Sequence, residues 1–228
     1  MKATITKSDL VNGLKAVTGV ASGKGTTLPI LSHLLIEAKG GRLTITGTDL
    51  DLTVQATVPA TIEGDFSTTV PSRKFSQIGK ESPSEAVEIE VLKNNTLKIV
   101  SGSSSFKVCG LPSEEFPSNG KFNTQYRFLM NQEDLREGIK RVESSVSTDE
   151  TRYVLNGVLF QLTSNLLTLV ATDGRRLSMS KHKVPFDGGE KKFILPSRAV
   201  SELSKLIGKD GDVVVEVCDN KASFAMAD

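Results

Sequence analysis

The sequence predicts an α+β fold built from two tandem copies of one domain, each with two helices packed on antiparallel sheets. Residues 31–49 align without a gap with residues 155–173, an offset of 124 positions. A repeat of this length indicates a duplicated domain rather than a short-period solenoid. Short alternating apolar runs joined by Gly or Asn turns predict antiparallel strands with one solvated face. The 228 residues allow each copy its own hydrophobic core.

Each copy is expected to open with a short strand and an amphipathic helix. In the first copy Lys2–Thr6 alternates as a strand does, and Leu10, Leu14 and Val17 then recur at helical spacing, with Ser8 as the expected N-cap. The second copy repeats this order with the strand Arg127–Met130 and the apolar positions Leu135, Ile139 and Val142.

A hairpin and a further strand come next. Leu31–Glu37 and Arg42–Thr46 are joined through Gly40-Gly41, and Ser164-Asn165 provides the corresponding turn in the second copy. The alternating segment Asp51–Pro59 predicts the strand that follows the hairpin.

The second half of the first copy repeats the order of strand, helix and strands. Phe66–Val70 is the expected strand, and Pro71 starts a helix that runs to about Gly79. The remaining expected strands are Val87–Leu92, Thr96–Ser101 and Ser105–Leu111.

The second copy lacks a counterpart of the last strand. Val213–Val217 and Ala222–Met226 match two strands of the first copy, but nothing matches Ser105–Leu111. We therefore expect an unpaired sheet edge and a chain that is part of something longer. The expected division is a first domain over residues 1–118, a linker over 119–126 and a second domain over 127–228. The stretch Pro112–Asn123, rich in Pro, Ser, Asn and Gly, indicates the connection.

Composition argues against several classes of protein. Apolar residues make up 38% and charged residues 24%, as is ordinary for a soluble protein. Cys109 and Cys218 do not occupy equivalent positions, which argues against a shared disulfide or metal site and fits a reducing cytoplasm. No secretory segment and no apolar run near the roughly 20 residues of a membrane span is found. We expect no metal and no cofactor.

No catalytic constellation is evident. His33 is expected to be a structural or surface strand residue, and His182 to belong to a solvated charged run. The repeated pairs Thr48-Asp49 and Thr172-Asp173 follow apolar strands, where their side chains are expected to cap the turn through backbone N–H groups.

Positively charged residues at two helix starts are more informative about function than the histidines and the Thr-Asp pairs. Arg73-Lys74 and Arg198 lie in the first turn of the second helix of each copy, where the helix dipole disfavours positive charge. One interpretation is a phosphate site built from free N–H groups and a guanidinium; the other is that an exposed arginine is simply tolerated. Lys24 and Lys140-Arg141 could join the same face. The net charge of +1 allows one basic face balanced by acidic residues elsewhere.

The two copies diverge directly after the Thr-Asp pair. The second copy has Gly174–Leu177 where the first has Leu50–Thr53. This divergence is either neutral drift or the mark of a task that only one copy performs.

Several strings resemble the β sliding clamp family, the processivity subunits of bacterial replicative DNA polymerases. The resemblance runs in order from Met1 to Asp228 and rests on TLPILSHLLIEA, TGTDLDL, TVPSRKF, RYVLNGVLF and VATDGRRLSM. It implies three like domains per chain and a head-to-tail dimer that closes a ring around duplex DNA. The present chain resembles the first domain and most of the second, which puts ring closure in doubt without the third.

The resemblance also implies two sets of site residues. The DNA-binding set is Lys24, Arg73, Lys74, Arg152, Tyr153 and Arg198. The partner-peptide pocket is Leu155, Thr172, Gly174, Arg175, Arg176 and Leu177. The implied partners are duplex DNA and peptides from the polymerase α subunit, the clamp loader and other polymerases and repair proteins.

The expected function is therefore that of a non-enzymatic DNA clamp. Two alternatives remain: an open-surface nucleic-acid-binding module that forms no ring, and an enzyme.

Overall fold

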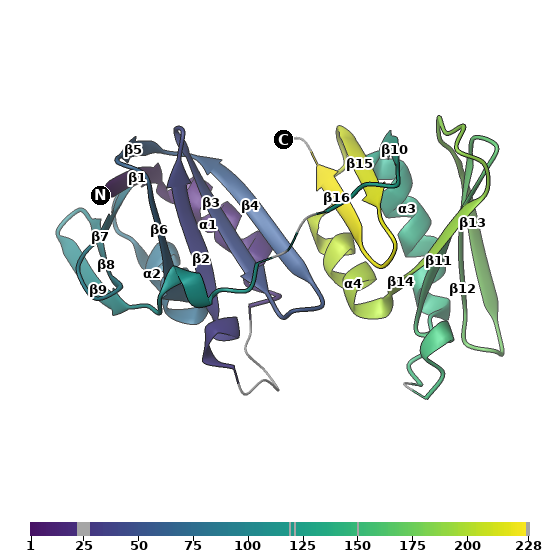
Figure 1. Ribbon diagram of the computed structural model, residues 1–228, viewed down its shortest axis with the longest axis horizontal. Coiled ribbons are helices and arrows are strands. Elements are labelled where there is room, and N and C mark those ends of the chain that lie inside the picture. The colour runs from purple at the N-terminus through teal and green to yellow at the C-terminus, as the bar shows by residue number, and fades with distance from the viewer. Residues whose placement is uncertain (22–27, 119, 121, 150, 227–228) are drawn as a thin grey trace. The chain divides into compact units, whose positions relative to one another are not determined.

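The computed structural model describes residues 1–21, 28–118, 120, 122–149 and 151–226. The chain divides into two compact units, Met1–Asn119 and Gly120–Asp228. Within its described residues, each unit contains two α-helices and two antiparallel sheets (Figure 1). This is the α+β architecture that the repeat predicted.

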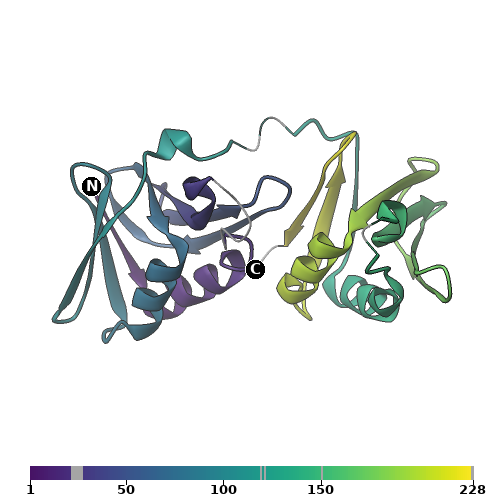
Figure 2. The same cartoon turned by 90° about the horizontal axis from the view of Figure 1, so that it is seen from below.

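The first unit pairs a five-stranded sheet with a four-stranded one. The larger sheet has the order β5-β1-β7-β8-β9, with β1 Lys2–Thr6, β5 Thr61–Glu63, β7 Ala86–Val91, β8 Thr96–Ser101 and β9 Ser104–Cys109. The smaller sheet has the order β4-β3-β2-β6, with β2 His33–Lys39, β3 Arg42–Thr48, β4 Thr53–Pro59 and β6 Phe66–Pro71. Helix α1 (Lys7–Val17) packs on β3 and β4, and α2 (Ser72–Glu81) lies beside it (Figure 2).

The second unit repeats this plan with fewer strands. One sheet has the order β10-β15-β16, with β10 Tyr126–Asn131, β15 Asp212–Val217 and β16 Ala222–Met226 at an edge. The other has the order β13-β12-β11-β14, with β11 Gly157–Thr163, β12 Leu166–Thr172, β13 Leu177–Lys183 and β14 Lys191–Pro196. Helix α3 (Gln132–Val142) packs on β12 and β13 and contacts α4 (Ser197–Leu206).

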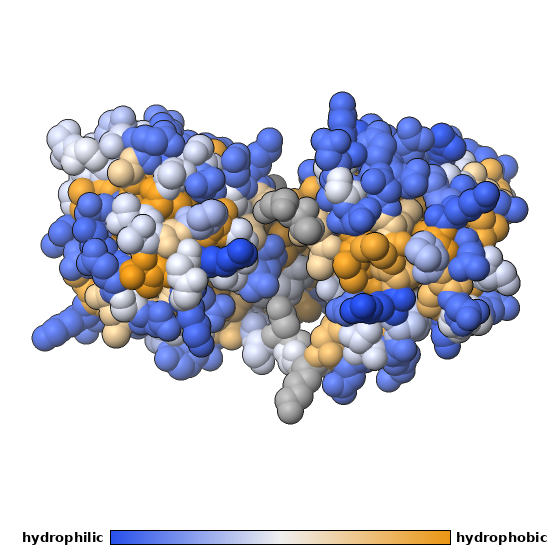
Figure 3. All heavy atoms as spheres, turned by 90° about the horizontal axis from the view of Figure 1, so that it is seen from above, coloured by the Kyte–Doolittle hydropathy of each residue, from blue (hydrophilic) through white to orange (hydrophobic). Residues whose placement is uncertain are grey.

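The predicted apolar helix positions form the cores. Leu10, Leu14 and Val17 are buried in the first unit, as are Leu135, Ile139 and Val142 in the second. Among the residues that the structure describes, no helix is long and apolar enough to cross a membrane. Exposed apolar side chains lie among hydrophilic ones on both units in the face drawn in Figure 3.

The predicted N-cap of the first helix was wrong. Helix α1 begins at Lys7, and the cap is Thr6, whose side chain accepts a hydrogen bond from the N–H of Asp9. Thr6 has extended backbone angles, as an N-cap requires, whereas Ser8 is already inside the helix.

The predicted strand Leu31–Glu37 begins two residues too early. Pro29–Ser32 form a 3-10 turn, and β2 starts at His33. Leu31 is buried there against Ile30 and Phe116. Phe116 follows the short 3-10 turn Ser113–Glu115, so the first part of the stretch Pro112–Asn123 packs on the first unit.

The strand predicted over Ser105–Leu111 ends early, at Cys109. Leu111 leaves the sheet to pair with β6: its N–H donates to Thr69 Oγ1 and its carbonyl accepts from the same hydroxyl, both at 2.8 Å. Gly110 permits this crossing, since an added Cβ would lie 1.9 Å from the Thr69 carbonyl oxygen.

Candidate functional site

Two of the four described α-helices begin without a cap. Helices α2 and α4 follow Pro71 and Pro196, and neither has a side-chain cap or an acidic residue in its first turn. Arg73 and Arg198 are the second residues of these helices, and both are exposed. The structure thus places the predicted cations at equivalent helix starts in both units.

The other two helices are built in the opposite way. Helix α1 is capped by Thr6 and carries Asp9 in its first turn. Helix α3 is capped by Asn131 and carries Glu133 and Asp134. These caps and acids complement the positive dipole end of α1 and α3, whereas α2 and α4 have neither a side-chain cap nor a first-turn acid.

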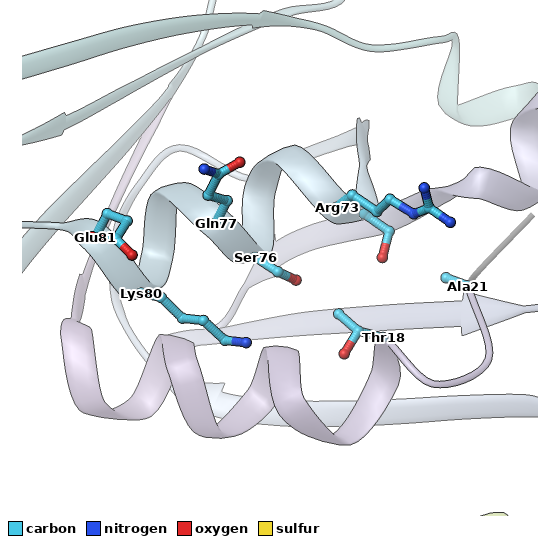
Figure 4. Close-up of a pocket in the computed structure, with 8 residues that line it drawn as sticks. Thr18, Ala21, Arg73, Ser76, Gln77, Lys80 and Glu81 are labelled. Carbon is cyan, nitrogen blue, oxygen red and sulfur yellow. The ribbon is translucent and has the colours of Figure 1, made fainter.

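An open groove of about 340 Å³ lies beside α2 in the first unit (Figure 4). Ser76 and Lys80 point from α2 toward Thr18, just beyond α1, and Arg73 lies at the same end of the groove as Ala21. The Ser76 hydroxyl is buried without a hydrogen-bond partner among the described residues. The groove walls are Thr18, Ala21, Ser72, Arg73, Ser76, Gln77, Lys80 and Glu81. Lys74 is exposed on the same helix.

Arg152 and Tyr153 are presented by a short loop. Arg152 Nε pairs with Asp149 Oδ2 at 3.5 Å. The Thr151 hydroxyl and N–H both donate to Asp149 Oδ1, which lowers the pKa of that carboxyl. Tyr153 starts the 3-10 turn Tyr153–Leu155 and is 81% exposed, so its ring is available for stacking.

Asn156 joins this loop to the start of α4. Ser197 donates its backbone N–H to the Asn156 carbonyl at 3.0 Å and its hydroxyl to Asn156 Oδ1 at 2.5 Å. The structure thereby brings the Arg152-Tyr153 segment close to Arg198. Sequence reasoning missed Asn156, since the repeat gives no signal: the first copy has Ser32 at that position, bonded to the Pro29 carbonyl.

The Thr-Asp pairs cap their turns as predicted. Thr172 Oγ1 accepts from the N–H of Gly174, and Asp173 Oδ1 accepts from the N–H groups of Arg175 and Arg176. These two backbone hydrogen bonds are the main cause that lowers the pKa of Asp173 to about 2. The first unit builds the same turn on Thr48 and Asp49.

The turn and the Arg152 loop are adjacent. A Cβ added to Gly174 would lie 3.2 Å from Arg152 Nη1. Leu177 is 61% exposed at the end of the turn, and Leu155 is partly exposed at the end of the loop. The structure therefore places residues from both predicted pocket segments near one another in the second unit, with Arg175 and Arg176 exposed.

The prediction for His182 was wrong. Its side chain is 9% exposed and packs against α3, where Gly138 leaves room: an added Cβ would lie 2.7 Å from His182 Nε2. Sequence periodicity placed the charged run but not the facing glycine. Lys24 lies outside the described residues. Among the described residues, no group of three or more His, Cys, Asp or Glu could hold a metal ion.

The two repeated units define a chain of the DNA-clamp fold, and solved structures share it. A DNA polymerase sliding clamp from Bacillus subtilis superposes with a TM-score of 0.94 at 30% identity, over 99% of this chain and 62% of that one. The family profile described as DNA polymerase III beta subunit, N-terminal domain, matches residues 1–120, and that of the central domain matches residues 129–228. The chain belongs to the DNA polymerase III beta subunit family.

Curated relatives carry the name beta sliding clamp. The Vibrio cholerae protein is 35% identical over 218 residues, which is 94% of this chain and 59% of that protein. The Escherichia coli K12 protein is 32% identical over 231 residues, covering 100% of this chain and 63% of that protein. The chain therefore spans about three fifths of the length of these relatives.

Proposed function

We propose that this chain is part of a DNA sliding clamp that confers processivity on a replicative polymerase by encircling duplex DNA. The observation that carries the proposal is the pair of equivalent helix starts, uncapped and bearing Arg73 and Arg198. The positive end of a helix dipole and a guanidinium together favour a phosphate. Family membership supplies the context.

Sparse cationic contacts suit a clamp. Contacts to phosphate are independent of sequence and weaken with salt, so they hold the duplex without arresting movement along it. Lys24, Lys74, Arg152 and Tyr153 complete the proposed DNA-binding set, and persistence comes from topology when a ring is closed by a head-to-tail dimer. A net charge of +1 is compatible with this role, because the attachment needs no uniformly basic surface.

The second proposed site is a peptide pocket in the second unit. Leu155 and Leu177 provide apolar contacts, and the Thr172–Arg176 turn provides the rim. Peptides from the polymerase, the clamp loader and repair proteins are the proposed occupants. We infer that the protein acts without catalysis and in the cytoplasm.

The test is duplex binding as a function of salt. Fluorescence anisotropy with linear duplexes of two unrelated sequences should give the same weak affinity, falling steeply between low and moderate salt. Arg73→Ser and Arg198→Ser should each reduce the slope of log K against log salt by about 1. Lys98→Gln is the matched control, since Lys98 pairs with Glu90 on a sheet. Tight binding to only one sequence, or slopes unchanged in both variants, would refute the proposal.

A further inference from the structure

Two hydrogen bonds fasten a short turn of the second unit to the start of helix α4. Ser197, the first residue of α4, donates its N–H to the Asn156 carbonyl at 3.0 Å and its hydroxyl to Asn156 Oδ1 at 2.5 Å. Gly157 and Pro196 form the last pair of the β11–β14 ladder, and a proline has no N–H to donate. The link between Asn156 and Ser197 therefore continues the contact of the two strands beyond the end of their ladder.

The fastened turn carries residues of both sites proposed above. The 3-10 turn Tyr153–Leu155 lies directly before Asn156. Its first residue belongs with Arg152 to the proposed DNA-binding set, and its last residue belongs to the proposed peptide pocket. On the other side of the link, Arg198 follows Ser197 in α4. The Asn156 side chain thus connects a segment shared by the two sites to the helix start that carries the proposed phosphate contact.

The internal hydrogen bonds of the turn fix its shape but not its position. The N–H of Leu155 donates to the Arg152 carbonyl at 2.8 Å, and a turn closed in this way can move as one piece. Its position depends on bonds to other segments. The Leu155 carbonyl accepts from the N–H of Ser147 in the preceding loop at 3.1 Å, and Asn156 accepts from Ser197 in α4. The bonds to Ser197 are therefore what holds the turn at the helix start.

The first unit directs the corresponding side chain elsewhere. Ser32 stands at the position of Asn156, and its hydroxyl donates to the Pro29 carbonyl at 2.7 Å. Both of these residues lie within the same 3-10 turn, Pro29–Ser32. The side-chain bond that is local in the first unit is thus made to a different element in the second unit.

We propose that Asn156 is a positioning residue for both sites of the second unit, a role that rests on the function proposed above. Asn156 holds the Tyr153–Leu155 turn against α4, so that the turn and Arg198 meet one duplex together. The same bond keeps Leu155 at the peptide pocket. Without it, either ligand would have to order the turn on binding, and the lost conformational entropy would weaken both affinities.

The position of the turn can be measured without either ligand. The chain has two tyrosines, so Tyr126→Phe leaves Tyr153 as the single tyrosine. In that background, Asn156→Ala should lower the steady-state anisotropy of tyrosine fluorescence, because the turn becomes mobile. Asn156→Asp keeps an oxygen that accepts from the Ser197 hydroxyl and should preserve the anisotropy. Ser201→Ala, which truncates an exposed serine on the same helix, is the matched control.

Binding should separate positioning from charge. Asn156→Ala should weaken duplex binding about fivefold, which corresponds to about 1 kcal/mol. The variant removes no cation, so its slope of log K against log salt should stay unchanged, whereas Arg198→Ser should lower the slope by about 1. Titration with the peptide from the polymerase tail should show a similar fivefold loss in Asn156→Ala.

The conservative variant should restore one activity and not the other. Asn156→Asp should bind the peptide within twofold of the unchanged protein, because the turn is still held. It should bind the duplex weakly, since a carboxylate at the start of α4 repels phosphate. Ser197→Ala should reproduce the losses of Asn156→Ala, and the double variant should lose little more, because both changes remove the same side-chain bond.

Two results would overturn this role for Asn156. One is an Asn156→Ala protein with the anisotropy and both affinities of Ser201→Ala; the other is additive losses in the double variant with Ser197→Ala. Failure of the proposed function has a different signature. The unchanged protein would then bind neither ligand, or Arg198→Ser would leave the salt slope unchanged, while the tyrosine anisotropy would still fall in Asn156→Ala.

Discussion

At residues 50 and 174 the backbone takes the same left-handed conformation, with φ of 84° at Leu50 and 85° at Gly174. Both residues follow a Thr-Asp pair whose side chains hold the turn. Glycine adopts this conformation at no steric cost, whereas a leucine is destabilised there because its Cβ lies too close to the backbone. The first unit therefore carries a strained turn where the second carries a relaxed one.

Exchanging these residues should have opposite effects. The left-handed conformation costs a non-glycine residue about 1–2 kcal/mol, and glycine loses roughly 0.5–1 kcal/mol through the unfolded state, so Leu50→Gly should stabilise the first unit by up to about 1.5 kcal/mol. Gly174→Leu should destabilise the second unit, because its Cβ would also approach Arg152. Urea unfolding followed by circular dichroism measures both changes. A destabilising Leu50→Gly would show that the turn is not strained.

His182 predicts a pH dependence of the second unit. Burial is the main cause that lowers its pKa below 6.5; Asp134 and Glu137 oppose the shift, and Arg141 supports it. The unfolded chain then binds the proton more readily, so stability is full above about pH 6.5 and is lost as pH falls toward the folded-state pKa.

Tyrosine fluorescence can measure this pH dependence. Both tyrosines, Tyr126 and Tyr153, lie in the second unit, so tyrosine fluorescence reports its unfolding. His182→Gln should remove part of the loss in unfolding free energy between pH 7.5 and pH 5. An identical pH profile in the variant would contradict the assignment.

At the scale of elements, the helix starts are of two kinds: one kind stabilises the helix, and the other carries the proposed phosphate-binding arginines. Two helices have side-chain caps and first-turn acids, and two have neither. An arginine in the first turn opposes the helix dipole, so local stability is sacrificed where an anion is expected.

Arg73→Asp should have opposite effects on helix stability and on duplex binding. The variant should stabilise α2 by about 0.3–1 kcal/mol at low salt, because a carboxylate suits the positive end of the dipole, while it weakens duplex binding. Lys80→Asp, in the last turn of the same helix, should instead lower stability. Thermal unfolding at low and high salt checks both. If Arg73→Asp lowered stability, Arg73 would have a structural role.

Most helices and strands could be predicted from the sequence, because the same pattern of apolar residues and turns occurs in both copies. The β1 and β8 bounds and the Ser164-Asn165 turn, with φ of 48° and 65°, are as predicted. The errors lie where the chain leaves regular structure: the cap at Thr6, the 3-10 turn at Leu31 and the end of β9. Each depends on a single hydrogen bond or a tertiary contact, which periodicity does not record.

At the scale of the whole molecule, two kinds of surface follow from one duplicated fold. The helix starts and the Thr-Asp turn repeat in both units, whereas the exposed Leu177 and the residues Gly174–Arg176 before it belong to the second unit only. A duplicated domain can thus repeat one surface feature in both copies and carry another in only one of them.

Leu177→Ala should separate the two functions. Because Leu177 is 61% exposed, truncation should change stability by no more than about 0.5 kcal/mol. Titration with a peptide from the polymerase tail should show a loss of more than about 1 kcal/mol of binding free energy. Arg176→Ala should also weaken binding, and duplex binding should be unchanged in Leu177→Ala. Unaltered titration curves would place the pocket elsewhere.

The sequence by itself determined the duplicated domain, the α+β class and the cations at the helix starts, because each is a local sequence pattern that occurs in both copies. It also contained the divergence at Gly174. Only the tertiary structure decided that Asn156 ties the Arg152 loop to α4 and that His182 packs on Gly138. These facts depend on cross-strand register and on packing between elements far apart in sequence, which no local pattern encodes.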